Sequence, residues 1–330
     1  MKAIVQDEYG SPDVLELRNI DQPENRDREV LVRVHAAGVD RGVWHLMTGM
    51  PYLMRVIGFG LRAPKNPVRG REVAGVVVAV GKDVTSFKPG DEVYGIGEGS
   101  FAEYVRVRED KLAPKPANLS FERAAVVPVS GSTALQAVRD KGRIQPGQNV
   151  LIIGASGGVG TFAVQIAKSF GADVTGVCST TKMDLVRSLG ADHVIDYTSE
   201  DFAEKEHYYD VILDTGGHST LSQLRRALTP KGTLVIVGSE TDGRLLGGFD
   251  RSIRAMLLSG FVSQKLVALT NSENAEDLTA IKKLIEADKV TPVIDRTFSL
   301  SEAPKAIHYL REGHARGKVA ITVLMATGTS

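Results

Sequence analysis

The sequence predicts an α/β protein with two domains, one a partly closed β-barrel and the other a doubly wound parallel sheet. The chain has 330 residues, which is more than one hydrophobic core usually holds. Short strands separated by Gly and Pro fill the first third, as is typical of a barrel. From about residue 148 onward, strands and helices alternate, and this order requires parallel strands with helices on both faces.

The barrel is predicted from period-two alternation of apolar and polar residues. Residues 30–37, 73–80 and 101–107 read as strands, and a Lys-Pro-Gly turn at 88–90 precedes a further strand. Residues 319–324 alternate again, and we expect this last strand to return to the first domain.

The parallel sheet is predicted from apolar runs between amphipathic segments. The expected strands are 149–153, 172–177, 193–195, 209–214 and 233–237. Apolar side chains from Val159 to Phe170 form one stripe of a helix, and further helices are expected at 182–189, 221–228 and 275–288.

The most informative segment is the glycine-rich loop after the strand at 149–153. Gly157 and Gly160 fit the second and third glycines of a dinucleotide-binding fingerprint, and the small residue Ala155 takes the place of the first. Gly157 would face a pyrophosphate, and Gly160 would let the helix pack close to the sheet. A helix N-terminus favours such an anion.

The next strand indicates which dinucleotide binds. It ends in Cys178-Ser179, followed by Thr180, Thr181 and Lys182, with no carboxylate before Asp184. A carboxylate there would bind a free 2′-hydroxyl, whereas hydroxyls and a lysine suit a 2′-phosphate. We therefore expect NADP rather than NAD.

Composition limits the classes of partner and compartment. Formal net charge is zero, which gives no general attraction to nucleic acid or to an anionic membrane. Cys178 is the one cysteine, so no intrachain disulfide can form. No signal-peptide core and no apolar run long enough to span a bilayer are evident, and we expect a cytoplasmic protein.

Six segments in order resemble the medium-chain dehydrogenase/reductase superfamily, in its zinc-independent quinone oxidoreductase branch. They are 36–40 (AAGVD), 70–75 (GREVAG), 90–95 (GDEVYG), 99–104 (GSFAEY), 154–160 (GASGGVG) and 314–318 (HARGK). The resemblance implies a GroES-like barrel domain, 1–118 and 288–330, and an inserted Rossmann domain, 119–287. It also implies a homodimer that pairs strands near 258–264.

The resemblance assigns cofactor contacts by position. The pyrophosphate would lie on Ser156, Gly157, Gly158 and Val159, and the 2′-phosphate on Ser179, Lys182 and Tyr197. Thr133 would approach the nicotinamide. Three further segments would close over the cofactor: Val237, Gly238 and Ser239; Phe261 and Val262; and His314, Ala315 and Arg316.

No metal is expected. Zinc-dependent relatives carry Cys and His where this chain has Asp40 and Arg71, and their structural zinc needs four cysteines. His35 and His45 lie near Asp40 in sequence, but His35 falls inside an apolar strand, which favours a packing role.

Chemistry without a metal favours an acceptor that is already electron-poor. We expect hydride transfer from NADPH to a quinone or to an α,β-unsaturated ketone or aldehyde, whose own oxygen takes up the charge. The residues from Asp40 to Ile57, with Phe59, would form the pocket wall. Tyr52 is the candidate donor to the substrate oxygen, and Asp40 would orient the pocket or a water. The alternative interpretations, Asp40 as a residue that only caps a turn and Tyr52 as a surface residue, are equally open. The basic residues Arg62, Lys65, Arg69 and Arg71 form either a solvated face or a guide for anionic substrate.

Two rival functions stay open at this point. One is a metal-free alcohol or carbonyl oxidoreductase. The other is a non-enzymatic NADPH-binding protein with a structural or RNA-binding role, against which the balanced charge argues.

Overall fold

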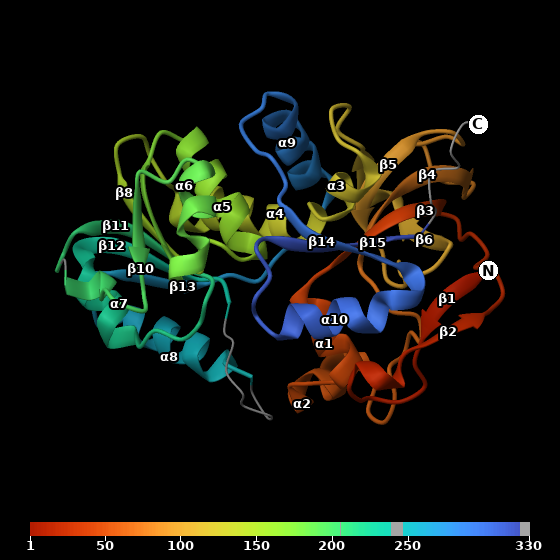
Figure 1. The fold of residues 1–330 in the computed structure, drawn as a ribbon, viewed down its shortest axis with the longest axis horizontal. Helices are drawn as coiled ribbons and strands as arrows, with labels where there is room; N and C mark the ends of the chain where they lie inside the picture. The colour runs from red at the N-terminus through yellow and green to blue at the C-terminus, as the bar shows by residue number, and fades with distance from the viewer. Residues whose placement is uncertain (205, 239–246, 324–330) are drawn as a thin grey trace. The chain divides into compact units, whose positions relative to one another are not determined.

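The computed structural model describes residues 1–204, 206–238 and 247–323. These residues form two compact units, shown in Figure 1. The barrel unit comprises 1–130, 273–286 and 292–330, and the parallel-sheet unit comprises 131–272 and 287–291. Together they have the α/β architecture that the sequence predicts.

The border between the units differs from the predicted one at three places, one of which is residues 288–291, expected in the barrel domain but packed with the parallel sheet. The predicted Rossmann domain starts at residue 119 and ends at 287, whereas residues 119–130 and 273–286 pack with the barrel. The second segment is held there by its backbone carbonyls. Tyr94 Oη donates to the Leu278 carbonyl at 2.6 Å, and Asn118 Nδ2 donates to the Ile285 carbonyl at 3.0 Å. The functional domain boundary stays a prediction.

The parallel-sheet unit contains one six-stranded sheet in the order β10-β9-β8-β11-β12-β13. Every neighbouring pair in it is parallel. Its strands are β8 (Asn149–Ile153), β9 (Asp173–Cys178), β10 (His193–Asp196), β11 (Tyr209–Asp214), β12 (Leu228–Ile236) and β13 (Lys265–Ala268).

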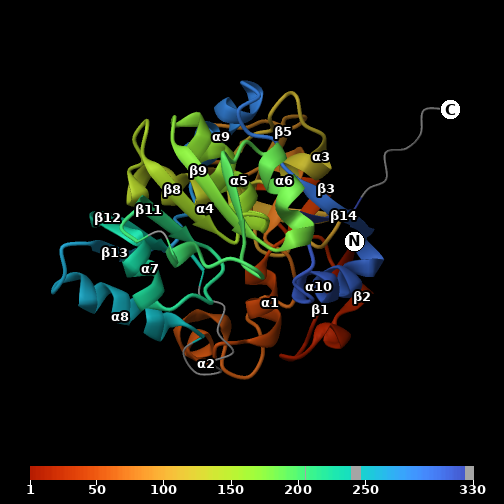
Figure 2. The same ribbon diagram turned by 60° about the vertical axis from the view of Figure 1, so that its left-hand side comes forward.

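Helices cover both faces of this sheet, as the alternation of elements requires. Figures 1 and 2 show α5 and α6 on one face and α7 and α8 on the other. Their bounds are α5 (Gly158–Ser169), α6 (Met183–Ser188), α7 (Leu221–Ala227) and α8 (Phe249–Ser259). The predicted stripe on α5 is correct, since Phe162, Ala163, Ile166 and Ala167 are fully buried. Burial of Phe162 and Ile166 stabilises the fold by about 2 kcal/mol each.

The order of strands creates a switch point beside β8. The chain moves outward from β8 to β9 and β10, and then returns to the other side of β8 with β11. In such sheets the loops at the carboxyl ends diverge at this point, and ligands bind there. The glycine-rich loop begins at this point.

The barrel unit is built on one large sheet and a small hairpin. The large sheet has the order β14-β15-β3-β4-β5-β7, and β6 also pairs with β3. The strands are β3 (Glu29–Val39), β4 (Glu72–Val80), β5 (Glu92–Ile96), β6 (Tyr104–Arg108), β7 (Leu112–Pro114), β14 (Ile294–Ser299) and β15 (Lys318–Thr322). β1 (Lys2–Val5) and β2 (Glu16–Asn19) form the hairpin. As expected, the C-terminal strand β15 joins the first domain, antiparallel to β3.

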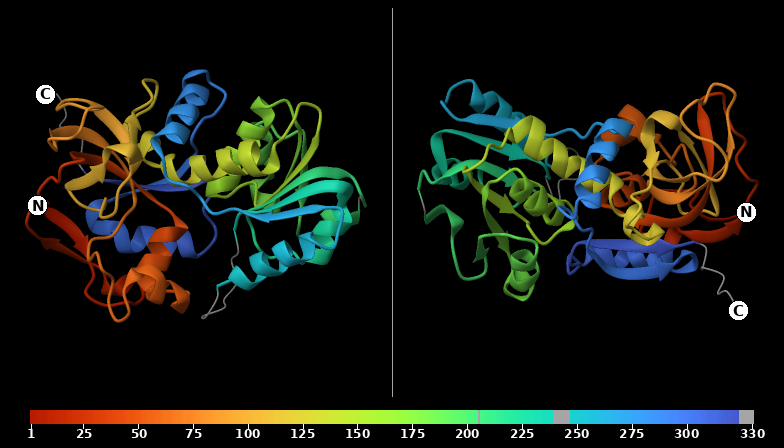
Figure 3. Two further views of the ribbon diagram at one scale, coloured as in Figure 1. Left: turned by 180° about the vertical axis from the view of Figure 1, so that it is seen from behind. Right: turned by 90° about the horizontal axis from the view of Figure 1, so that it is seen from above.

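Helices of the barrel unit flank this sheet. They are α1 (Arg41–Thr48), α2 (Tyr52–Met54), α3 (Phe121–Ala125), α9 (Ala275–Glu286) and α10 (Ala303–Arg311); α4 (Pro128–Leu135) crosses the border between the units. Figure 3 shows α10 running beside β14 and β15. Its buried residues Ala306 and Ile307 share a core cluster with Val319 and Ile321 of β15.

No helix among the described residues is both long and apolar enough to cross a membrane.

Candidate active site

The glycine-rich loop joins β8 to α5 through a turn that admits very little side chain. The Gly157 amide donates to the Gly154 carbonyl at 3.0 Å, and Gly154 itself has a φ of 79°. A Cβ on Gly160 would lie 2.1 Å from the Gly154 carbonyl oxygen, so this position requires glycine. A Cβ on Gly157 would meet only that same oxygen, at 3.3 Å. Gly160 therefore sets helix packing, while Gly157 is open toward a ligand.

The start of α5 is suited to an anion. Gly157 is the N-cap residue and supplies no side-chain cap. The first amides of a helix have no partner within the helix, and its dipole favours negative charge there. Ser156, Gly157, Gly158 and Val159 lie at this N-terminus. The loop thus fits a dinucleotide pyrophosphate.

Two further turns lie against the same edge of the sheet. Thr215, after β11, donates its hydroxyl to the Ile153 carbonyl at 2.7 Å. A Cβ on Gly238, after β12, would lie 2.5 Å from the Thr215 carbonyl oxygen. The Val237 and Gly238 amides both donate to the Asp214 carbonyl. The structure therefore brings Val237 and Gly238 to the edge of the glycine-rich loop, and adds Thr215, which the sequence analysis missed.

Polar side chains follow the carboxyl end of β9. Ser179 and Lys182 are half-buried in the turn that leads into α6, and Tyr197, after β10, is 62% exposed. The Tyr197 amide donates to the Cys178 carbonyl at 3.1 Å, which holds the turn after β10 against the end of β9. The three predicted 2′-phosphate residues therefore share one corner of the sheet.

One carboxylate in this corner was not predicted. Asp196 ends β10 in register with Cys178, and its side chain accepts hydrogen bonds from the Thr180 and Thr198 hydroxyls. Burial and the Asp196 carboxylate raise the pKa of the Cys178 thiol to about 11. A strand-terminal Asp in the neighbouring strand is the sequence signal that would have identified it.

Other predicted cofactor residues lie elsewhere. Phe261 and Val262 precede β13, so they lie at its amino end, opposite to the edge that carries the glycine-rich loop. The structure does not bring these two residues to that loop, because the amino ends of parallel strands lie at the same edge of the sheet.

Thr133 is buried in α4. Ser239 lies outside the described residues. His314, Ala315 and Arg316 form a turn of the barrel unit, where the Arg316 amide donates to Asp295 at 3.1 Å.

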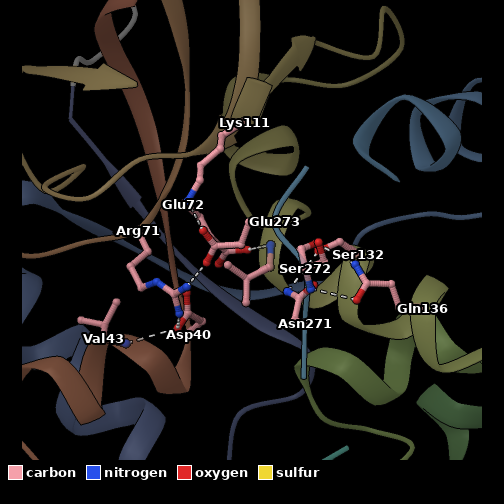
Figure 4. Close-up of polar contacts among 11 residues, drawn as sticks. Asp40, Val43, Arg71, Glu72, Lys111, Ser132, Gln136, Asn271, Ser272 and Glu273 are labelled. Atoms are coloured by element: carbon pink, nitrogen blue, oxygen red, sulfur yellow. Dashed lines mark hydrogen bonds and ion pairs between the residues drawn. The ribbon is translucent and has the colours of Figure 1, made fainter. Parts of the chain in front are cut away.

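In the barrel unit, Asp40 belongs to a network of charged side chains (Figure 4). Asp40 is 6% exposed and caps α1, with Oδ1 accepting from the Val43 amide at 3.2 Å. Its other oxygen has no hydrogen-bond partner among the described residues. Arg71 lies 4.0 Å from Asp40 and forms an ion pair with Glu273, to which Lys111 also donates at 2.6 Å. The capping role of Asp40 is thus present in the structure.

Glu273 stays ionised within this network. Burial opposes its charge, but Arg71 and Lys111 outweigh burial and lower the pKa of the Glu273 carboxyl. Residues 71 and 273 are 202 positions apart, so no local pattern in the sequence signals this pair.

A second ion pair lies in the core of the barrel unit. Lys318 of β15 donates to Glu72 of β4 at 2.6 Å, and the Val129 amide donates to the other oxygen of Glu72 at 2.9 Å. Both side chains are at most 3% exposed. Burial raises the pKa of the Glu72 carboxyl, and the Lys318 charge opposes that shift. Removal of either partner would leave a buried charge unpaired.

Tyr52 lies at the far end of α1 from Asp40. Asp40 precedes the first residue of this eight-residue helix, which is about 12 Å long, and Tyr52 follows its C-cap Gly49 by three residues. Tyr52 is 38% exposed, and the Arg55 guanidinium lies 4.8 Å from its ring centre. The two predicted catalytic residues are therefore attached at opposite ends of α1.

The histidines near Asp40 in sequence make packing and hydrogen-bond contacts. The His35 ring stacks on Phe121 with ring centres 4.2 Å apart, and burial lowers the pKa of His35. His45 Nδ1 lies 2.9 Å from the Met50 carbonyl. Within the described residues, no three His, Cys, Asp or Glu side chains gather as metal ligands would.

Comparison with known proteins identifies the family. Residues 26–117 match the model of the alcohol dehydrogenase GroES-like domain, and residues 189–321 match the model of a zinc-binding dehydrogenase.

Two curated relatives and one solved structure cover nearly the whole chain. The NAD(P)H oxidoreductase RTN4IP1 of Mus musculus is 34% identical, covering 98% of this chain and 89% of the relative. The NADPH-dependent alkenal/one oxidoreductase of Arabidopsis thaliana is 35% identical, covering 97% and 79%. The quinone oxidoreductase structure from Coxiella burnetii is 31% identical with a TM-score of 0.86, covering 98% and 99%.

These matches agree with the barrel, the parallel sheet and the glycine-rich loop described above. The chain is an oxidoreductase that belongs to the medium-chain dehydrogenase/reductase superfamily, in its quinone-oxidoreductase-like branch.

Proposed function

We propose that this protein reduces a quinone or an α,β-unsaturated carbonyl compound with NADPH and without a metal ion. The observation that carries the proposal is one corner of the parallel sheet. There the glycine-rich loop after β8 lies next to the carboxyl end of β9, which lacks a carboxylate. Gly157 is open toward a ligand, and Ser179 and Lys182 follow β9 where an NAD site would carry Asp or Glu. The relatives named for alkenal/one and for quinone reduction support the same acceptors.

The cofactor residues have separate tasks. The amides at Ser156, Gly157, Gly158 and Val159 would hold the pyrophosphate, and Ser179, Lys182 and Tyr197 would surround the 2′-phosphate. Asp196 bears a negative charge in that corner, but its oxygens already accept from Thr180 and Thr198. Lys182 would balance the charge of the phosphate. Val237, Gly238 and Thr133 would border the rest of the cofactor. The family resemblance assigns a further contact to His314, Ala315 and Arg316.

A catalytic zinc does not fit the residues present. Asp40 and Arg71 occupy the positions at which zinc-dependent members of the family carry Cys and His. A guanidinium cannot ligate zinc, and Arg71 already pairs with Asp40 and Glu273.

The reaction then depends more on how the chain orients the acceptor and the cofactor than on a strong acid or base among its side chains. When bound, reduced nicotinamide supplies the hydride, and a conjugated acceptor spreads the resulting charge onto its own oxygen. The chain has to hold the acceptor, exclude water and offer a hydrogen bond to that oxygen. Tyr52 can donate from its phenol, and Asp40, through its free oxygen, can orient a water.

Compartment and assembly are further proposals. We propose a cytoplasmic homodimer that pairs strands near residues 258–264. The one buried cysteine supports a reducing compartment, and the family resemblance supports the dimer.

The test is an NADPH-oxidation screen of quinones, conjugated enals and enones, and saturated ketones and aldehydes, repeated with NADH and with a chelator. We expect turnover of the quinones or conjugated acceptors, preference for NADPH and no effect of the chelator. Turnover of saturated ketones alone would favour an alcohol or carbonyl oxidoreductase instead. Loss of activity with the chelator would contradict the metal-free proposal.

A further inference from the structure

A pocket of about 90 Å³ lies within the barrel unit, beside α1. Its apolar walls include Val43 from α1, Phe59 and Val68. A single water needs about 10–15 Å³ measured this way, so the pocket has room for a small polar group with a short carbon chain.

Arg69 lines this pocket with a buried and incompletely bonded guanidinium. The residue is 3% exposed. Its Nη2 donates to the Asn66 carbonyl, but its Nε has no hydrogen-bond partner, and no Asp or Glu of the described residues forms an ion pair with it. Burial lowers the pKa of Arg69 to about 10, so the group still carries its charge at neutral pH. The exposed Glu98 carboxylate opposes this shift without forming an ion pair, so burial of the guanidinium is only partly offset.

The backbone that carries Arg69 is fixed on both sides. The Arg69 amide donates to the Ile4 carbonyl at 3.0 Å, and its carbonyl accepts from the Phe101 amide at 2.8 Å. The next residue, Gly70, accepts from the Gly99 amide at 2.9 Å. The guanidinium is therefore held by a rigid segment, which lowers the entropy lost when a ligand binds.

The charges around the pocket favour an anion. Lys65 and Glu98 also line it, and both are exposed, so Arg69 is the buried charge at the wall. The nearby Tyr9 hydroxyl donates to the Gly60 carbonyl at 2.7 Å and is thereby occupied. Two cations and one carboxylate leave a net positive charge. A planar guanidinium binds a carboxylate through two parallel hydrogen bonds.

One residue of the pocket wall also contacts Asp40. Val43 lines the pocket, and its amide donates to Asp40 Oδ1 at 3.2 Å. A lining residue of the pocket thus lies one helical turn after Asp40, in the same helix that Asp40 caps.

We infer that Arg69 binds the carboxylate of the acceptor, which makes the substrate a conjugated ketone or aldehyde with a carboxylate a few carbons from its double bond. This inference rests on the proposed function and narrows it. Arg69 acts as a specificity residue, and the apolar walls accommodate the carbons next to the carboxylate.

The test compares 6-oxohept-4-enoate with its isosteric neutral carboxamide as acceptors for NADPH. We expect the wild-type kcat/KM to favour the acid at least about tenfold, since charge-assisted hydrogen bonds are worth that much. Arg69→Gln should bring the ratio close to one, and Arg69→Lys should restore part of it. Arg28→Gln, at an exposed residue of the barrel unit outside the pocket lining, is the matched control and should keep the wild-type ratio. Equal use of acid and amide by the wild type would overturn the inference and leave the proposed function intact.

A second measurement separates the pocket from the reaction. Butanoate carries the carboxylate without an acceptor, and its binding can be followed by ligand-observed NMR. We expect butanoate to bind the wild type and to inhibit competitively against 6-oxohept-4-enoate. In Arg69→Gln we expect neither binding nor inhibition. Butanoate binding that ignores Arg69 would overturn the inference. Butanoate binding that depends on Arg69, in a protein that reduces no quinone or enone, would overturn the proposed function and the assignment of the pocket to an acceptor.

Discussion

The parallel-sheet unit and the barrel unit build their candidate sites from different materials. The first relies on backbone: Gly154, Gly157 and Gly160 shape a loop at the start of α5. The second relies on side chains: Asp40, Arg71 and Glu273 form a charged network, and Arg69 lies buried nearby. A backbone site tolerates few changes at its glycines, whereas a side-chain site can change its ligand by single substitutions. We therefore expect the first to fix the cofactor and the second to set the substrate.

The largest effect is expected from substitution within the glycine-rich loop. Gly160→Ala would place a Cβ 2.1 Å from the Gly154 carbonyl oxygen, so the helix start has to shift and would disturb the proposed pyrophosphate site. We expect NADPH affinity to fall by at least about a hundredfold, measured by nucleotide fluorescence.

Gly157→Ala is the matched variant for that prediction. Its Cβ meets only the Gly154 oxygen, at 3.3 Å, so we expect an unfolding temperature near that of the wild type and a weaker loss of NADPH affinity, about tenfold. If Gly160→Ala bound NADPH as tightly as the wild type, the claim that the backbone of the glycine-rich loop fixes the cofactor would be wrong.

The barrel unit should show its largest effect in stability. Lys318→Met leaves Glu72 buried without its partner, and we expect the free energy of unfolding to fall by about 3–5 kcal/mol in urea titrations. The double variant Glu72→Gln/Lys318→Met removes both charges and keeps an acceptor for the Val129 amide. It should recover most of the loss. A single variant as stable as the wild type would show that this pair does not stabilise the barrel.

Much of the fold and the glycine-rich loop could be predicted from the sequence, because these features depend on residues that are close together along the chain. The strand, glycines and helix of 149–169 lie within one run of chain, and the alternation that predicts β3 and β15 is a property of each strand alone. The charged networks join residues such as Arg71 with Glu273 and Glu72 with Lys318, which only folding brings together. Phe261 and Val262 were assigned by position in the family, and the direction of β13 places them at the opposite edge.

Selectivity for NADPH over NADH tests the predicted 2′-phosphate site at the carboxyl end of β9. Lys182→Ala removes the cation nearest in sequence to the end of β9, and we expect the NADPH-to-NADH ratio of kcat/KM to fall about tenfold. Arg187→Ala, whose side chain pairs with Asp184 at 3.1 Å, is the control and should leave the ratio unchanged. An unchanged ratio in Lys182→Ala would remove Lys182 from the site.

Acid should weaken the Arg71–Glu273–Lys111 network. Because these cations lower the pKa of Glu273, its contribution to stability is present above the unfolded-state value near 4.3 and is lost as pH falls through the lower folded value. We expect Glu273→Gln to cost about 1–2 kcal/mol at pH 7 and to approach the wild type as the pH falls below the folded-state pKa of Glu273, in unfolding temperatures recorded across the acid range. A difference that is constant with pH would contradict the assigned charge state.

The smallest effect concerns Cys178. Burial and Asp196 raise the pKa of its thiol to about 11, so very little thiolate exists at pH 7. We expect slow labelling by iodoacetamide in the folded protein and rapid labelling in urea, followed by mass spectrometry. Rapid labelling of the native protein would show that the end of β9 is more open than the structure indicates.

The central claim, reduction of a conjugated acceptor by NADPH, is tested most directly by the fate of the hydride. NADPH deuterated at the transferring position of the nicotinamide is mixed with but-3-en-2-one, and the product is examined by NMR. The account predicts butan-2-one with deuterium on the former β-carbon. Formation of but-3-en-2-ol with deuterium on the carbon that bears the hydroxyl, or no oxidation of NADPH with any quinone or enone, would contradict it.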